Sequence, residues 1–269
     1  MSAFAPLYWS KKGAHLERWL IALCVAGDHY GEYGCSNGYA VILSSPTLLG
    51  RELSPLLVVD QATGDPGRVV AAAADLAPFP AARGTYYPGR RRLIGSGDVT
   101  AAHYARALLG RLAPAINSAF ALDGFDLLQA SFSMVTARPG ELAPPQRAPH
   151  FDSTDLLYLA ILHYLGGTEN SGTAFFRQRS TAIERVTEVN RHAFVAAAQI
   201  EAAGTHGYID GSNASFEEIG KVDGVADRVI VYPGSLLHSG RIPPDMTFSE
   251  DPRQGRLTAN FFVRGRPRR

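Results

Sequence analysis

The sequence is poor in cysteine, has no marked excess of either charge and contains no long apolar run. Its only cysteines among 269 residues, Cys24 and Cys35, fit neither a disulfide framework nor a zinc motif. The 26 Lys and Arg against 25 Asp and Glu give a formal net charge of +1, which indicates neither a nucleic-acid partner nor an anionic membrane. The longest apolar run near the N-terminus, residues 19–27, is too short to cross a bilayer. We therefore expect a globular protein with reduced thiols in the cytoplasm.

The length suits one sizeable domain, which buries enough apolar surface to need no disulfide or metal for its stability. Residues 1–50 carry little regular pattern, and we expect them to form an N-terminal extension of unassigned role. The functional domain is then expected over residues 51–269. The sequence predicts no oligomeric state.

The order of predicted elements indicates the fold class. The segment 56–60 is a short apolar strand, and Asp65 followed by Pro66 offers an N-cap and a first helical residue for a helix to about residue 76. A second helix begins near residue 98, and Pro114 kinks or ends it. After residue 124 the period becomes that of strands, interrupted by one helix over about 184–203. The predicted strands cover 127–137, 154–165, 173–177, 228–232 and 256–263. Helices followed by many strands favour a mainly β fold with flanking helices, a double-sheet jelly-roll or cupin-like core.

Two histidines and one aspartate form a candidate metal site. His150 and Asp152 lie two positions apart, so on a strand both side chains face the same way, with Phe151 facing away. A second histidine, His238, lies 86 residues after Asp152 and follows an apolar strand and a Pro-Gly-Ser turn. Two imidazoles and one carboxylate leave open positions on a metal, an arrangement typical of non-haem iron(II) oxygenases.

The last predicted strand carries a candidate anion site. Its alternation places Arg256, Thr258 and Asn260 on one face and apolar residues on the other. A buried guanidinium is costly unless an anion meets it. A carboxylate of a dicarboxylic acid matches the guanidinium fork and a neighbouring hydroxyl donor. The Tyr164 hydroxyl would complete this pocket, whereas His163 faces the opposite side and is predicted not to bind the metal.

At these residues the sequence resembles the 2-oxoglutarate/iron(II) dioxygenases of the prolyl-hydroxylase type, over residues 56–263. In detail it looks like a bacterial branch of that superfamily whose members mostly lack an assigned function. The resemblance depends on an ordered set of motifs. They are PHFD (149–152), YLGG (164–167), GTAFF (172–176), YPGSLLHSG (232–240) and RLTANFF (256–262), with YYPG (86–89) and FEEIGKV (216–222) typical of that branch.

The resemblance implies a double-stranded β-helix that binds Fe(II), 2-oxoglutarate and O₂. His150, Asp152 and His238 match the metal ligands of the superfamily. Arg256, Thr258 and Tyr164 match the residues that bind the remote carboxylate of 2-oxoglutarate. The implied activity is hydroxylation of a small-molecule or amino-acid- or peptide-derived substrate with release of succinate and CO₂.

The position of the basic residue departs from the usual spacing of that superfamily and leaves an alternative arginine open. Arg256 follows His238 by 18 positions, further than is usual for the basic residue of the family. Arg241 is the competing candidate, but it is expected in a loop over 241–255 and lacks the context of a strand. Two other functions also stay open: desaturation or cyclisation at the same site, and a cupin-like protein that binds a metal or ligand without turnover.

Overall fold

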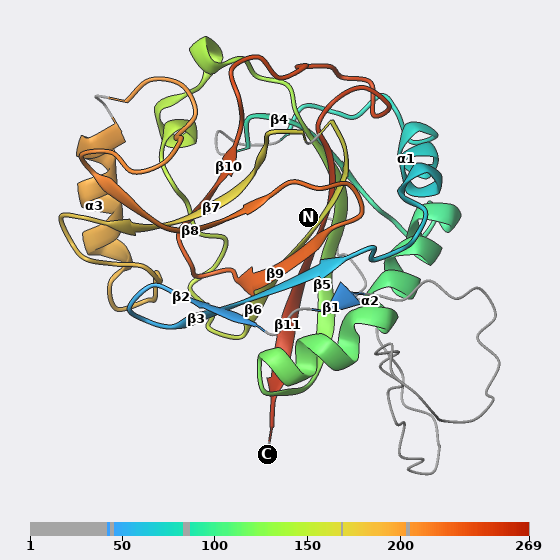
Figure 1. Ribbon diagram of the computed structural model, residues 1–269, viewed down its shortest axis with the longest axis horizontal. Helices are drawn as coiled ribbons and strands as arrows, with labels where there is room; N and C mark the ends of the chain where they lie inside the picture. Colours follow the sequence, from blue (N-terminus) through green and yellow to red (C-terminus); the bar gives the residue numbers. More distant parts are fainter. Residues whose placement is uncertain (1–41, 44–45, 83–86, 168, 203–204, 269) are drawn as a thin grey trace.

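Two antiparallel sheets face each other, and helices cover their outer sides (Figure 1). The structure is a computed structural model that describes residues 42–43, 46–82, 87–167, 169–202 and 205–268. Cys24, Cys35, the apolar run over residues 19–27 and Tyr86 lie outside the described residues. In the described part of the chain, no helix is both long and apolar enough to cross a membrane.

The larger sheet has eight strands in the order β1-β3-β9-β6-β11-β5-β4, with β2 paired to β3. All of its pairings are antiparallel. Its strands are β1 (Ile42–Leu43), β2 (Thr47–Leu49), β3 (Ser54–Asp60), β4 (Gly89–Leu93), β5 (Leu122–Val135), β6 (Tyr158–Gly166), β9 (Val229–Pro233) and β11 (Leu257–Pro267). Because β1 and β2 both pair with β3, part of the segment before residue 51 joins this sheet. The division at residue 51 stays a prediction.

The smaller sheet has the order β10-β7-β8. It contains β7 (Gly172–Gln178), β8 (Phe216–Asp223) and β10 (His238–Arg241). Side chains alternate across β7: Phe175 packs between the two sheets, whereas Ala174 and Phe176 pack on the outer side. This alternation gives the molecule one apolar layer between its sheets and another outside the smaller sheet.

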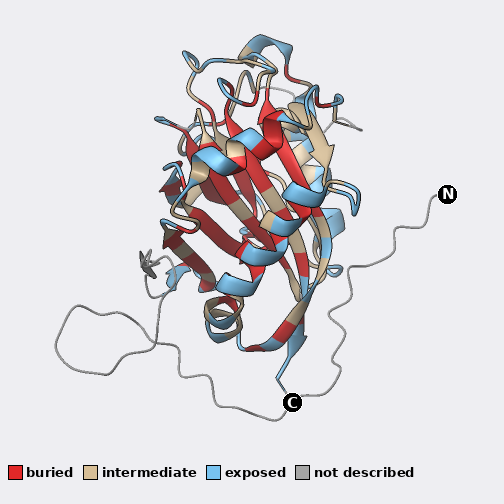
Figure 2. Ribbon diagram, turned by 90° about the vertical axis from the view of Figure 1, so that its right-hand side faces the viewer, coloured by how far each residue is buried: buried red, intermediate tan, exposed pale blue. Residues whose placement is uncertain are grey.

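Helices α1 (Pro66–Ala74) and α2 (Val99–Ala119) cover the outer face of the larger sheet. Their buried side chains pack on Leu257, Ala259 and Phe261 of β11, and their outer faces are exposed (Figure 2). Helix α3 (Arg191–Ala202) covers the smaller sheet through Phe194, on the other side of the molecule in Figure 1. The predicted mainly β, double-sheet fold with flanking helices is therefore confirmed.

The sequence left open whether Pro114 kinks or ends the second helix, and it placed the start of the third helix too early. Helix α2 passes through Pro114 without ending, because the packing of Leu108, Leu112 and Ile116 against the sheet holds both halves together. The third helix begins at Arg191 and not near residue 184. Residues 184–186 instead pair with the turn after β9, where the backbone N–H of Val186 donates to Ser235 O at 2.7 Å.

Candidate functional site

A cavity of about 110 Å³ lies between the sheets. Its walls come from β4, β5, β6, β7, β9, β10 and β11, and from the segments that connect strands. Three charged side chains line it: Arg91, Asp152 and Arg256. His150 and His238 line it as well, so the structure brings the predicted metal ligands into the same cavity as the predicted carboxylate-binding arginine.

His150 and Asp152 lie on an irregular segment and not on the regular strand that the sequence analysis assumed. His150 forms a single antiparallel bridge with His238, with backbone N–H groups donating in both directions at 2.9 Å. The Asp152 N–H donates to Gly234 O at 2.7 Å. Phe151 packs edge-on against Phe194 of α3, on the outer side. His150 and Asp152 therefore face the cavity and Phe151 faces away, as the sequence predicts, although backbone contacts with Gly234 and His238 replace the hydrogen bonds of a regular strand.

Gly234 allows this close approach of backbone to backbone. A Cβ atom on Gly234 would lie 2.5 Å from Tyr158 Cδ1 and 3.4 Å from Asp152 Cβ. The contact of 2.5 Å would force the Tyr158 ring or the turn to shift, whereas 3.4 Å from Asp152 is an ordinary van der Waals distance. The Pro-Gly-Ser turn thus holds Asp152 from one side while His238, four residues later, enters from the other.

The side chain of His238 is oriented by the backbone. This residue begins β10 and is buried, and its Nδ1 lies 2.8 Å from Leu236 O. Since a carbonyl only accepts, Nδ1 carries the proton and Nε2 presents its lone pair to the cavity. Metal-binding histidines are commonly fixed by such a hydrogen bond on the second ring nitrogen.

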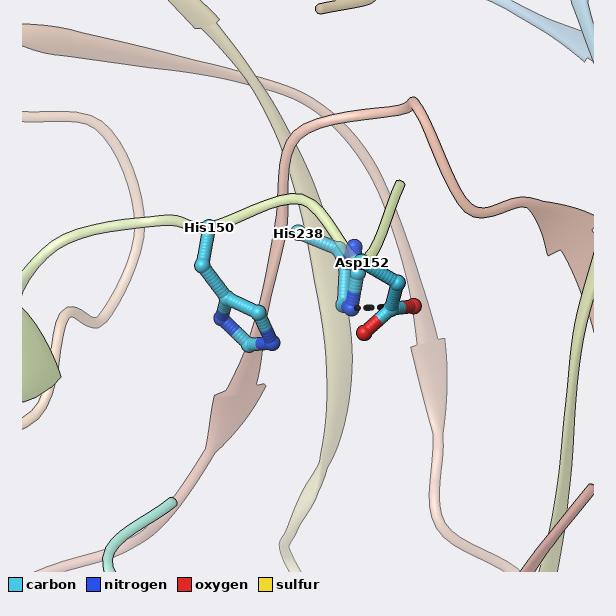
Figure 3. Close-up of side chains that lie close together, drawn as sticks. All are labelled: His150, Asp152 and His238. Atoms are coloured by element: carbon cyan, nitrogen blue, oxygen red, sulfur yellow. Dashed lines mark ion pairs between the residues drawn. The ribbon is translucent and has the colours of Figure 1, made fainter. Parts of the chain in front are cut away.

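The three side chains converge on one point (Figure 3). One ligand atom from each of His150, Asp152 and His238 lies within 4.8 Å of the other two. Asp152 Oδ2 is 3.6 Å from His238 Nε2, and the two imidazole centroids are 4.3 Å apart. The donors leave a gap between them that a single metal ion can bridge.

The protonation states suit a metal ligand set. Burial lowers the pKa of His150 well below its usual range, and the neighbouring His238 and Arg91 act in the same direction. The imidazole is therefore neutral and has a free lone pair. Burial raises the pKa of Asp152, opposed by His238 and Arg91, and its Oδ2 is buried without a hydrogen-bond partner among the described residues. A carboxylate oxygen left in this state fits a cation.

Arg256 lies one residue before β11 and is buried. Its Nε donates to Ser171 Oγ at 3.0 Å and its Nη2 donates to Gly172 O at 3.1 Å. It forms no ion pair within the part of the chain that the structure describes. Its charge is therefore available to an anion in the cavity.

Thr258 and Tyr164 both lie near Arg256, but only Thr258 lines the cavity. Thr258 lines the cavity, and its hydroxyl is 3.4 Å from Ser133 O. Tyr164 lies behind the wall: its ring centroid is 5.7 Å from the Arg256 guanidinium, and its hydroxyl is 2.7 Å from Thr173 Oγ1. Thr173 itself lines the cavity. The structure thus brings all three predicted residues together, but Thr173 stands between the Tyr164 hydroxyl and the cavity.

Arg241 does not lie in a loop, as the sequence analysis expected; it is the last residue of β10. Its guanidinium forms an ion pair of 2.8 Å with Asp223 and a longer one of 3.8 Å with Asp210. It is not one of the residues that line the cavity. Of the two competing arginines, Arg256 is the one placed to meet a ligand there.

Sequence reasoning missed three further residues of the cavity: Tyr87, Arg91 and Tyr208. The sequence analysis assigned no strand to the segment around Tyr87 and Arg91, whereas Gly89–Leu93 forms strand β4. The strand period would have separated Arg91 from Arg90 and Arg92. Tyr208 lies in a segment rich in Gly, Ser and Asn that carries no comparable signal.

His163 lies on the other face of the larger sheet, as predicted. It is completely buried, with Nδ1 2.6 Å from the Tyr104 hydroxyl and Nε2 3.0 Å from Asp227. These contacts hold α2 and the segment before β9 against β6. His163 is therefore a structural residue.

The comparison with protein families assigns the chain. The model of a family of unknown function, DUF6445, matches residues 44–263. The chain belongs to this family. No curated protein matches the DUF6445 chain.

Solved structures similar to this DUF6445 chain include oxygenases of the predicted type. A Pseudomonas putida prolyl-4-hydroxylase is 16% identical, with 80% of this chain and 93% of that chain covered and a TM-score of 0.42. The α-ketoglutarate-dependent epimerase SnoN from nogalamycin biosynthesis is 11% identical, with 79% and 80% covered and a TM-score of 0.47. HygX from Streptomyces hygroscopicus, solved with nickel and 2-oxoglutarate, is 15% identical, with 78% and 82% covered and a TM-score of 0.44. The strand pairing, rather than these distant likenesses, carries the fold assignment.

Proposed function

We propose that this DUF6445 chain is an iron(II)- and 2-oxoglutarate-dependent oxygenase, with iron held by His150, Asp152 and His238. The observation that carries the proposal is the convergence of these three donors in one cavity, where a carboxylate oxygen of Asp152 is buried and has no hydrogen-bond partner among the described residues. Two nitrogens and one carboxylate oxygen form the donor set of non-haem iron oxygenases, and half of an octahedral coordination sphere stays open.

The proposed binding site of 2-oxoglutarate is the part of the cavity next to Arg256. A dicarboxylate that chelates the metal at one end needs a cation at the other, and Arg256 is buried without an acidic partner in the described chain. The Thr258 hydroxyl lies on the same face and is a second donor. We assign Tyr164 a supporting role, because its ring lies under the guanidinium and its hydroxyl contacts Thr173.

The residues of the chain then bind and orient the ligands and exclude water from the cavity. Bound iron(II) with 2-oxoglutarate and O₂ supplies an oxidative decarboxylation, in which one oxygen atom enters succinate and the other converts a substrate C–H into C–OH, with CO₂ released. His238 keeps its lone pair aimed at the cavity through the bond from Nδ1 to Leu236 O. Tyr232, Phe262 and Ile242 supply apolar walls that exclude water from a reactive centre. We propose hydroxylation of a small-molecule or amino-acid- or peptide-derived substrate.

Anaerobic titration tests the proposal. Iron(II) and 2-oxoglutarate added to the wild-type protein under argon should produce a visible charge-transfer band, and subsequent exposure to air should produce succinate. Asp152→Ala should lose both signals, because two imidazoles alone hold iron(II) poorly. Asp155→Ala is the matched control, since that carboxylate lies three residues away and pairs with Arg264 at the surface.

Two results would contradict the proposal. The absence of the band in the wild-type protein would remove the shared site of metal and 2-oxoglutarate. Iron binding without any change on addition of 2-oxoglutarate would instead support a cupin-like metal-binding protein without turnover.

A further inference from the structure

Strand β4 carries three consecutive arginines with different surroundings. Arg90 forms an ion pair with Glu250, and Arg92 forms one of 2.8 Å with Asp98. Arg91, between them, points to the opposite face and lines the cavity. It has no acidic partner among the residues described by the structure. The arginine that faces the cavity is thus the one of the three whose charge is not balanced by the protein.

Arg91 is held in position from two sides. Its Nε donates to Ser133 Oγ at 3.2 Å, and its guanidinium carbon lies 4.7 Å from the centroid of the Tyr87 ring. These contacts fix the plane of the guanidinium and leave both terminal nitrogens without a hydrogen bond to the described residues. The Tyr87 hydroxyl is buried beside it and, apart from a contact with Ser133, has no partner in the described chain. Arg91 and Tyr87 therefore offer a fork and a hydroxyl donor to one ligand group.

With the proposed cofactors bound, one positive charge of the cavity is left without a counter-charge. Arg91, Asp152 and Arg256 give the cavity walls a net charge of one positive. Iron(II) adds two positive charges and 2-oxoglutarate two negative ones, so the loaded site still carries one positive charge. Arg91 is half-buried, and a charge withdrawn from water is costly unless an opposite charge meets it, so the loaded site can accept one more anionic group.

Arg91 and Arg256 come from different positions in the larger sheet. It belongs to the edge strand β4, whereas Arg256 precedes β11, and β5 lies between these strands. Two strand spacings place the backbones of β4 and β11 about 10 Å apart. Arg256 is further held toward β7 by Ser171 and Gly172. The two guanidiniums thus have different anchors: Arg91 is bonded to Ser133 of β5, and Arg256 to Ser171 and Gly172 at β7.

We propose that Arg91, together with Tyr87, binds a carboxylate of the substrate, so that the enzyme acts on a carboxylic acid. This inference rests on the proposed function, because it assigns Arg256 to 2-oxoglutarate and the three ligands to iron. The guanidinium fork matches a carboxylate in two parallel hydrogen bonds. A single carboxylate balances the one remaining charge, whereas a phosphate monoester carries between about 1.5 and 2 negative charges at neutral pH.

Matched pairs of acids and amides test the substrate class. The probes are the proteinogenic L-amino acids and their N-acetyl derivatives, each beside its primary carboxamide, titrated calorimetrically under argon into protein loaded with manganese(II) and 2-oxoglutarate. At least one acid should bind about tenfold more tightly than its amide, as expected for a charge-assisted hydrogen bond. Arg91→Gln should remove that preference, and Arg91→Lys, which keeps the charge but not the fork, should restore part of it.

Arg90→Gln is the matched control on the same strand, because its guanidinium faces away from the cavity and pairs with Glu250. It should keep the preference for the acid. The inference is overturned if no acid is preferred over its amide. It is also overturned if Arg91→Gln weakens 2-oxoglutarate binding as strongly as Arg256→Gln does, since both guanidiniums would then bind the co-substrate. Failure of the proposed function looks different: the wild-type protein would then show no iron(II)–2-oxoglutarate band before any probe is added.

Discussion

Asp152 and Arg256 are charged side chains in the wall of one cavity, and neither has a protein partner that balances its charge among the described residues apart from the neighbouring imidazoles. The protein uses its other buried charges differently. Arg177, for example, pairs with Glu184 at 2.8 Å and also with Glu217. Burial of an unpaired charge costs several kcal/mol, roughly, unless a ligand meets it. The absence of acidic or basic partners for Asp152 and Arg256 among the described residues therefore marks this cavity as a ligand site.

Substitution distinguishes the two candidate arginines, Arg256 and Arg241. Arg256→Gln should weaken 2-oxoglutarate binding by about tenfold or more, because a charge-assisted pair with the carboxylate is lost. Iron(II) binding without 2-oxoglutarate should change little, since Arg256 contacts none of the three metal ligands. Arg241→Gln should leave 2-oxoglutarate binding nearly unaltered, because its guanidinium pairs with Asp223. Isothermal titration of each ligand measures both effects, and a reversed order of the two variants would make Arg241 the binding residue.

Some residues of the site could be predicted from the sequence and others could not. The spacing of His150 and Asp152 and the alternation around Arg256 depend on local geometry, which the sequence reports directly. Arg91 was missed because consecutive arginines look like a solvated surface, and the strand that places it on the opposite face from its neighbours was not predicted. Tyr208 reaches the cavity from an irregular loop whose path depends on tertiary contacts, such as the bond from its hydroxyl to Ala137 O at 2.7 Å.

The turn between β9 and β10 is the element on which the metal ligands depend. It holds Asp152 through Gly234 O and places His238 at the start of β10. The sequence predicted the turn from Pro233, Gly234 and Ser235 but not the contact with Asp152. The reason is that the partners lie far apart in the chain, so that local pattern carries no information on their pairing.

A substitution in this turn should act on the metal site. Gly234→Ala introduces a Cβ atom 2.5 Å from the Tyr158 ring, so the ring or the turn must shift, and a shift of the turn moves Gly234 O, which accepts from the Asp152 N–H. We expect a loss of about 1–3 kcal/mol in the free energy of unfolding and a weaker affinity for manganese(II). Gly110→Ala in α2 is the control, because its Cβ meets nothing within 4 Å and alanine favours a helix interior. Equal metal affinity in the two variants would show that the turn does not position Asp152.

A buried hydrogen-bonded group around His163, away from the cavity, connects a helix, a strand and a loop. His163 connects Tyr104 of α2 with Asp227, which also accepts from Thr63. Burial lowers the pKa of His163, although Asp227 opposes this shift. Burial alone would raise the pKa of Asp227, but hydrogen bonds from His163, Thr63 and Gly64 outweigh it and lower that pKa.

These shifts predict how stability depends on pH. The unfolded His163 binds a proton at its ordinary pKa of about 6.5, whereas the folded residue binds it only at lower pH. The unfolded chain therefore binds more protons as the pH falls below about 6.5, and the free energy of unfolding must decrease. Asp227 adds to this loss below about pH 4.

Urea unfolding of the metal-free protein at pH 7.5 and 5.5 measures the effect. His163→Gln should cost about 1–3 kcal/mol at pH 7.5, because buried partners lose a hydrogen bond, and should reduce the decrease toward pH 5.5. The remaining decrease includes His150, whose pKa is also lowered. An unaltered pH dependence in His163→Gln would contradict a neutral, buried His163.

The central claim is that His150, Asp152 and His238 bind one metal ion beside Arg256. The most direct measurement is the anomalous diffraction of a crystal grown under argon with manganese(II) and 2-oxoglutarate. We predict one strong peak in contact with all three side chains, with the 2-oxoglutarate chelating it and the remote carboxylate meeting the Arg256 guanidinium. A peak elsewhere, or a His238 imidazole turned away from the other two ligands, would contradict the account.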